Sequence, residues 1–196
     1  YYGGPAEKIE NVKYFLAFSY MHCDISEKAL GIFYEITSNY KLKAKDNLYF
    51  KAEAQIIDAK YWSFQEFKTL PAYINEFRKS WSIIEPKNPQ LEARSFLTAT
   101  NRMMVTYLAL DKIRLANKWL QKNVRLAIKY ESDEHLGYTY MDYAKGIYHL
   151  NLSLALKYLE LADLHFQMHD MNSSLQQFNT FFHYLTTPSS EPVSYT

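Results

Sequence analysis

Apolar and small residues recur along the chain in one spacing, 0, +3, +4 and +7, which places them on one face of a helix. The five copies begin at residues 14, 52, 101, 140 and 178, so their starts are separated by 38, 49, 39 and 38 residues. The copies are Tyr14/Ala17/Phe18/Met21, Ala52/Gln55/Ile56/Ala59, Asn101/Met104/Val105/Leu108, Tyr140/Tyr143/Ala144/Ile147 and Phe178/Phe181/Phe182/Leu185. A helical face that returns at such an interval predicts stacked helical hairpins, which share a long concave surface.

A second pattern follows each of the first four copies at a constant distance and predicts the partner helix of each hairpin. Its fullest copies are Ala29/Phe33/Ile36 and Ala155/Leu159/Ala162, with Ala116/Leu120 keeping the first two places and Phe67 leading the remaining copy. A small alanine lets two helix backbones approach closely, and the larger residues fill the groove beside it.

These patterns predict an all-α fold, a right-handed superhelix of antiparallel helical hairpins with about nine helices. The predicted helices cover residues 6–22, 25–40, 44–60, 63–83, 89–109, 112–131, 133–149, 152–170 and 173–186. One repeat domain, residues 1–187, would hold the hairpins 6–40, 44–83, 89–131 and 133–170 and the terminal helix 173–186. We expect the aperiodic tail, residues 188–196, to be disordered.

Proline marks the interruptions. Pro86 and Pro89 disfavour helix in the residues before them, so residues 85–89 predict the clearest break. Pro71 falls inside the predicted helix 63–83, where it predicts a kink or a split.

Composition excludes several classes of protein. Of 196 residues, 48% are apolar and 22% charged, as in ordinary globular chains, and the net charge of +1 gives no field that draws nucleic acid or an anionic membrane. Cys23 is the single cysteine, so an intramolecular disulfide is impossible and a cytoplasmic location is expected. The start, Tyr-Tyr-Gly-Gly-Pro, has no initiator Met, so we expect a fragment or a processed chain, which leaves room for another domain before Tyr1.

The residues resemble tetratricopeptide repeats. The nearest copy is Tyr140-x-x-Tyr143-Ala144-x-x-Ile147 followed by Ala155-Leu156-x-x-Leu159-x-x-Ala162, and the resemblance covers about residues 7–185. Asn101 stands where that repeat usually has a Trp-like residue, and Phe67 stands where it has alanine.

Long, tyrosine-rich repeats look more like the peptide-sensing regulators of Gram-positive bacteria, the Rap, Rgg and PlcR type. That resemblance implies a concave face that binds a short linear signalling peptide. It also implies an effector module, often helix-turn-helix, before the repeats.

In such a stack, the positions one, five and eight places after each pattern start face the concave side. They supply aromatic, acidic and basic groups that suit an extended peptide, with Arg102 and Lys145 as candidates for a carboxylate. Solvated basic side chains are an equally weighted alternative for these two. The candidate ligand-binding residues are Phe15, Ser19, His22, Glu53, Lys60, Asn101, Arg102, Thr106, Met141, Lys145 and Tyr148.

Asn101 occupies a core position, where an amide needs hydrogen-bond partners. It either satisfies the backbone of a neighbouring loop, the favoured alternative, or reaches the groove and pairs with a ligand's main chain.

Catalysis and cofactors are not expected, because the chain has no Gly-rich phosphate loop, no Gly-x-Ser-x-Gly and no His-Glu-x-x-His. His165 and His169 lie one turn apart but have no carboxylate motif around them, so no metal site is predicted.

Two partner classes remain open, a short signalling peptide sensed by a regulator and a protein held by a constitutive adaptor. The terminal helix 173–186 has no second helix to complete its hairpin, so a homodimer through that end is a further hypothesis.

Overall fold

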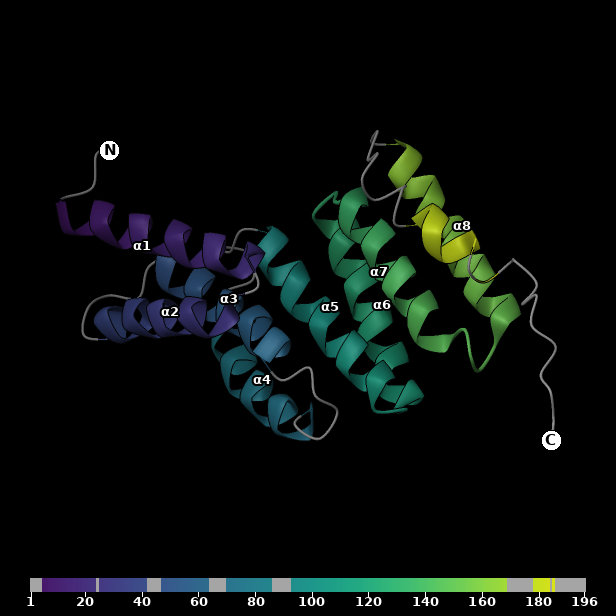
Figure 1. Cartoon of the computed structure of the whole chain (residues 1–196), viewed down its shortest axis with the longest axis horizontal. Coiled ribbons are helices and arrows are strands. Elements are labelled where there is room, and N and C mark those ends of the chain that lie inside the picture. Colours follow the sequence, from purple (N-terminus) through teal and green to yellow (C-terminus); the bar gives the residue numbers. More distant parts are fainter. Residues whose placement is uncertain are drawn as a thin grey trace. The chain divides into compact units, whose positions relative to one another are not determined.

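A computed structural model describes residues 5–23, 25–41, 47–63, 70–85, 93–168, 178–183 and 185, and all structural statements below concern these ranges. Helix is the only regular secondary structure in them (Figure 1). The labelled helices are α1 (Pro5–His22), α2 (Ser26–Lys41), α3 (Asn47–Ser63), α4 (Leu70–Ile84), α5 (Ala93–Ala109), α6 (Ile113–Lys129), α7 (Asp133–Ile147) and α8 (Leu152–Met168). Residues 178–183 are also helical.

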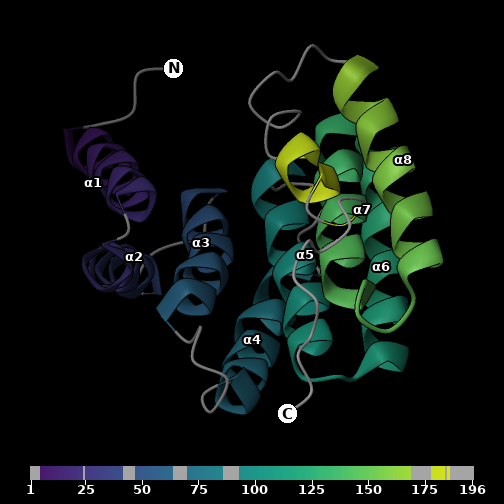
Figure 2. The ribbon, with the colours of Figure 1, turned by 45° about the vertical axis from the view of Figure 1, so that its right-hand side comes forward.

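The chain forms two compact units, residues 1–123 and 124–196, and α6 runs from the first into the second. In the first unit, α3 contacts α1, α2, α4 and α5, and Figure 2 shows α3 between α2 and α4. Helix α3 is therefore surrounded by other helices on several sides, and most of its residues are buried.

The recurring face is the packing face. None of the residues of the five pattern copies is exposed, and those of α3 are all buried. The partner-helix pattern is buried more completely, because Ala29, Phe33 and Ile36 of α2 are inaccessible to solvent, as are Ala155, Leu159 and Ala162 of α8. Consecutive helices pack as in a helical repeat, and the predicted all-α fold class is confirmed. The right-handed twist of the superhelix stays a prediction.

Part of the predicted helix 63–83 is described. The helix α3 continues to Ser63, and α4 begins at Leu70, so Pro71 is the second residue of α4. Proline is well tolerated in a first helical turn because the amide it lacks has no intrahelical partner there. Residues 64–69 lie outside the described residues, so the choice between a kink and a split stays a prediction. The predicted break around Pro86 and Pro89, the leading position of Phe67 and the tail 188–196 lie outside the described residues.

Two tight turns, before and after α6, share one backbone motif. The Lys112 amide donates to the Tyr107 carbonyl and the Ser132 amide to the Ala127 carbonyl, each at 2.9 Å. Asp111 and Glu131 lie between these partners in the left-handed region, with φ of 54° and 52°. This six-to-one bond closes the helix end and lets the next helix start at once.

In the second unit, α7 and α8 pack against each other as a hairpin (Figure 1). The Asn151 side chain accepts a hydrogen bond from the Leu154 amide at 3.0 Å and so caps the start of α8. Gly137 of α7 faces the ring of Phe166 so closely that a Cβ atom would lie 2.4 Å from it. The missing side chain therefore sets how closely these two helices approach. No helix within the described ranges is long and apolar enough to cross a membrane.

Candidate ligand-binding surface

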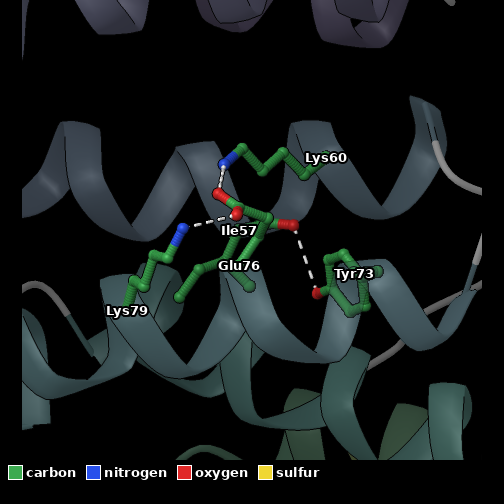
Figure 3. Close-up of polar contacts among 5 residues, drawn as sticks. All are labelled: Ile57, Lys60, Tyr73, Glu76 and Lys79. Atoms are coloured by element: carbon green, nitrogen blue, oxygen red, sulfur yellow. Dashed lines mark hydrogen bonds and ion pairs between the residues drawn. The ribbon is translucent and has the colours of Figure 1, made fainter.

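A polar contact in the first unit joins α3 to α4 through Glu76 (Figure 3). Its two carboxylate oxygens accept from different lysines, Lys60 of α3 and Lys79 of α4, each at 2.8 Å. Lys60 is the less exposed of the two lysines, at 12%, and its ammonium also lies 5.4 Å from the ring centre of Tyr34 on α2. One predicted ligand-binding cation thus already has an acidic partner and an aromatic partner within the fold.

These contacts change two pKa values. The hydrogen bonds from Lys60 and Lys79 lower the pKa of Glu76 to about 2. Burial by itself would lower the pKa of Lys60, but the hydrogen bonds with Glu76 and Tyr34 outweigh it and raise that pKa. Both groups therefore stay charged across the neutral range, and the contact persists there as an ion pair.

We expect the Glu76 contact to stabilise the fold above about pH 4.5 and to lose its effect as the pH falls toward about 2. The sign follows because the folded pKa lies below the ordinary value, so the unfolded chain takes up the proton first. Glu76→Gln should therefore unfold more easily at neutral pH and show a shallower loss of stability in acid. Urea unfolding at a series of pH values measures this. The same change at Glu35, whose carboxylate is 54% exposed and pairs with Lys13, should have a smaller effect.

A second ion pair joins α3 to α5. The Arg102 Nε atom lies 2.5 Å from an Asp58 carboxylate oxygen, and the two side chains are only 19% and 14% exposed. The guanidinium also lies over the ring of Tyr61, 4.9 Å from its centre. Tyr73 completes this region by donating from its hydroxyl to the Ile57 carbonyl at 3.2 Å. Burial first, and then the nearby Asp58 charge, raise the pKa of the Tyr73 hydroxyl well above its ordinary value, so it stays a neutral donor.

The predicted residues of α1 form the most accessible part of the candidate surface. Phe15 is 65% exposed, and Ser19 and His22 are also exposed. The Phe15 ring packs edge to face on the buried Tyr14 ring, with 5.8 Å between the ring centres. The His22 ring lies 4.6 Å from the Phe18 ring, and Ser19 donates to the Phe15 carbonyl. An aromatic, a hydroxyl and an imidazole are therefore available to a ligand along one helix.

Four other predicted residues are buried, namely Glu53, Asn101, Thr106 and Met141. Glu53 accepts a hydrogen bond from Tyr49, and burial together with the Glu53 charge and that bond raises the Tyr49 pKa to about 12. The Thr106 hydroxyl donates to the Arg102 carbonyl one turn earlier at 2.7 Å. In the described structure these side chains are parts of the packing, and their role in binding stays a prediction.

Asn101 contacts a second buried amide. The Asn123 amide nitrogen on α6 donates to the Asn101 side-chain oxygen at 3.4 Å, and the two residues are 1% and 8% exposed respectively. This contact is between side chains, and both interpretations of Asn101 from the sequence, a bond to a loop backbone and a contact with a ligand, stay predictions. The pair joins α5 to α6 within the first unit.

In the second unit, the predicted residues Lys145 and Tyr148 both meet Phe181. The Lys145 ammonium lies 5.8 Å from the Phe181 ring centre, and the Tyr148 ring meets Phe181 edge to face at 5.8 Å. The helix at 178–183 therefore packs back on the end of α7, as the pattern in Phe178, Phe181 and Phe182 predicts. Lys145 and Tyr148 remain half-buried under it.

Sequence reasoning did not find the acidic partners of the candidate cations. Asp58 and Glu76 carry no motif, and their partners Arg102 and Lys60 lie 44 and 16 residues away in sequence. Glu76 lies on the helix that follows Lys60, where a search for acids would have found it, whereas Asp58 lies two helices before Arg102. His165 holds the Asp133 carboxylate at 2.9 Å, and no three metal-ligating side chains gather in the described part of the chain. His169 lies outside the described residues.

Comparison with protein-family models, with curated proteins and with solved structures found no match to this chain.

Proposed function

We propose that this chain is a peptide- or protein-binding domain built from tetratricopeptide-like helical hairpins. The observation that carries the proposal is the repeated face, none of whose residues is exposed in any of the five copies. A stack of this kind has no single enclosed active site, and it offers a ligand the side chains of successive inner helices. Exposed residues on the first inner helix, α1, support this use.

The α1 residues Phe15, Ser19 and His22 suit an extended peptide because they combine an apolar ring with hydrogen-bonding groups. On α3, Lys60 occupies the position that His22 occupies on α1, eight places after the pattern start. A ligand carboxylate at Lys60 must compete with Glu76, which holds the ammonium at 2.8 Å. We therefore infer that apolar and main-chain contacts contribute more to affinity than a charge clamp does.

More specifically, we propose that the domain is the ligand-sensing part of a bacterial cytoplasmic regulator that responds to a short signalling peptide. For such a switch, the peptide must bind one curvature of the stack more tightly than another. The ion pairs between α3 and its neighbours are contacts that a change of curvature would lengthen or shorten. The effector module is a DNA-binding domain in the regulators that the chain resembles. Its activity would then depend on the curvature of the stack.

A constitutive adaptor is the second candidate. The ion pairs of Lys60 and Arg102 help to judge it. Adaptors that clamp an acidic tail need several cations directed at one carboxylate. Lys60 and Arg102 each hold an acid of the fold, which disfavours that clamp. An adaptor that recognises apolar side chains through α1 remains compatible with the exposed residues.

We expect Phe15→Ala to weaken the binding of a peptide selected from a random library by about tenfold, or roughly 1.4 kcal/mol. The measurement is titration calorimetry with the selected peptide. Ile9→Ala is the matched control, because Ile9 is also an exposed apolar residue of α1, at 56%, but lies about 120° around the helix from Phe15. Equal losses in both variants, or no loss in either, would contradict the proposed surface.

Asn101→Ala separates packing from recognition. If Asn101 only joins α5 to α6 through Asn123, the variant loses stability and keeps its affinity for the same peptide. If Asn101 also contacts the ligand, the affinity falls in conditions where the variant remains folded. Unfolding and calorimetry on one preparation distinguish the two outcomes.

A further inference from the structure

The outer face of α8 differs from the corresponding faces of α2 and α6. The three helices can be aligned on the buried alanine of their shared pattern, Ala29, Ala116 and Ala155, each inaccessible to solvent. The positions one residue before that alanine and six and nine residues after it lie about 100° or more around the helix from it. In α2 these positions hold Lys28, Glu35 and Ser38, in α6 Leu115, Lys122 and Arg125, and in α8 Leu154, Leu161 and Leu164.

The α8 residues are well exposed. Leu154, Leu161 and Leu164 are 38%, 41% and 54% exposed, and Met168, one turn further on, is 63% exposed. Four large apolar side chains on one stripe of a helix are costly to leave in water. Charged groups at the same register in α2 and α6 show that the fold itself does not require apolar residues there. The stripe therefore indicates a contact with something outside the described unit.

The spacing of the stripe is that of a two-helix seam. Leu154, Leu161 and Met168 are seven residues apart, and Leu164 lies between the last two at the second position of the heptad. The corresponding earlier position is Lys157, an exposed cation within the stripe. A helix that covers this stripe must therefore present leucine-sized side chains and one acid near Lys157.

A second copy of α8 meets both requirements when it runs antiparallel. In that register Leu154 of one copy faces Leu164 of the other, and Leu161 faces the stem of Lys157. The ammonium of Lys157 then comes beside Glu160 of the second copy, which is exposed and borders the stripe. A parallel pair in register would bring the two Lys157 ammonium groups together. The charge pattern thus selects the antiparallel, two-fold arrangement.

We propose that the outer face of α8 is a self-association surface, on which two copies of this chain pair through antiparallel α8 helices. The face lies within the second unit and consists of α8 residues alone, so this dimer differs from one formed through the terminal helix. It also does not depend on peptide binding. A single helix pair buries less area than standard stable interfaces, so the dimer forms and dissociates with concentration.

Sedimentation equilibrium of the whole chain over a range of concentrations tests the proposal. The wild-type mass should rise toward that of a dimer, and Leu161→Glu should abolish the rise. Leu152→Glu is the matched control, because Leu152 is similarly exposed, at 46%, but lies on the opposite side of α8 from Leu161. Circular dichroism shows whether each variant remains folded. A wild-type mass that stays monomeric at all concentrations would overturn the proposal.

A charge exchange tests the register. Lys157→Glu alone should weaken association at least tenfold, because it places like charges beside each other across the seam. The double variant Lys157→Glu with Glu160→Lys should restore it. If Leu161→Glu and both charge variants associate as the wild type does, another face forms the dimer, such as residues 178–185, and α8 is not the surface.

Discussion

Replacing Arg102 by alanine is expected to lower the free energy of unfolding of the first unit by about 3 kcal/mol. Removing one partner of a buried ion pair costs about 3 to 5 kcal/mol, because the remaining charge stays in the protein without its compensation. The Asp58 side chain is 14% exposed, which allows some solvation and places the effect at the lower end of that range. The variant also loses the packing of the guanidinium on Tyr61. Urea unfolding followed by circular dichroism measures the change.

Lys79→Ala provides the surface comparison. Its ammonium also holds a carboxylate, at 2.8 Å, but the lysine side chain is 74% exposed. Exposed pairs contribute at most about 1 kcal/mol, so we expect a loss well below that of Arg102→Ala. The double variant Asp58→Asn with Arg102→Met should recover part of the loss, since it leaves no uncompensated charge. Equal effects of Arg102→Ala and Lys79→Ala would show that the α3–α5 pair is solvated like a surface pair.

The sequence was sufficient to predict the helices because the information about them is local. The spacing that starts at Tyr14 or Tyr140 identifies a packing face without knowledge of any partner. Helix α7, for example, begins at Asp133 as predicted and ends at Ile147, two residues before the predicted end. Pro71 also marked a boundary from the sequence alone, and in the structure it lies in the first turn of α4.

The candidate surface was harder to predict because it depends on which helices surround each inner helix. The same offsets from the pattern start give an exposed Phe15 on α1 but a buried Glu53 on α3. The difference arises because α3 is contacted by α1, α2, α4 and α5, whereas in the described structure α1 packs mainly against α2 and only slightly against α3. Periodicity assigns one direction to equivalent residues, but neighbours on the other faces decide whether water reaches them. The ion pairs of Lys60 and Arg102 have the same cause, because their acidic partners lie on neighbouring helices.

Gly137 and Gly31 provide a test in which one substitution should have opposite effects at two sites. Gly137→Ala is expected to destabilise the second unit by about 1 to 3 kcal/mol, the usual cost of inserting a group into a packed interior. A Cβ atom there would lie 2.4 Å from one Phe166 ring carbon and 2.7 Å from another, and Phe166 is inaccessible to solvent. The ring is rigid and surrounded, so α7 and α8 must separate to admit the methyl group. The higher helix propensity of alanine, about 1 kcal/mol, offsets this only in part.

Gly31→Ala is the matched control, because no atom lies within 4 Å of its added Cβ and the residue is exposed within α2. There only the propensity remains, and we expect a gain of about 0.5 to 1 kcal/mol. Thermal unfolding of both variants measures whether each substitution raises or lowers the stability. A Gly137→Ala chain that also carries Phe166→Leu should recover part of the loss, since a smaller, more flexible side chain can move away from the methyl group. If Gly137→Ala stabilised the protein as Gly31→Ala does, the close approach of α7 to α8 at this glycine would be wrong. In that case the buried alanines, without Gly137, would set the distance between α7 and α8.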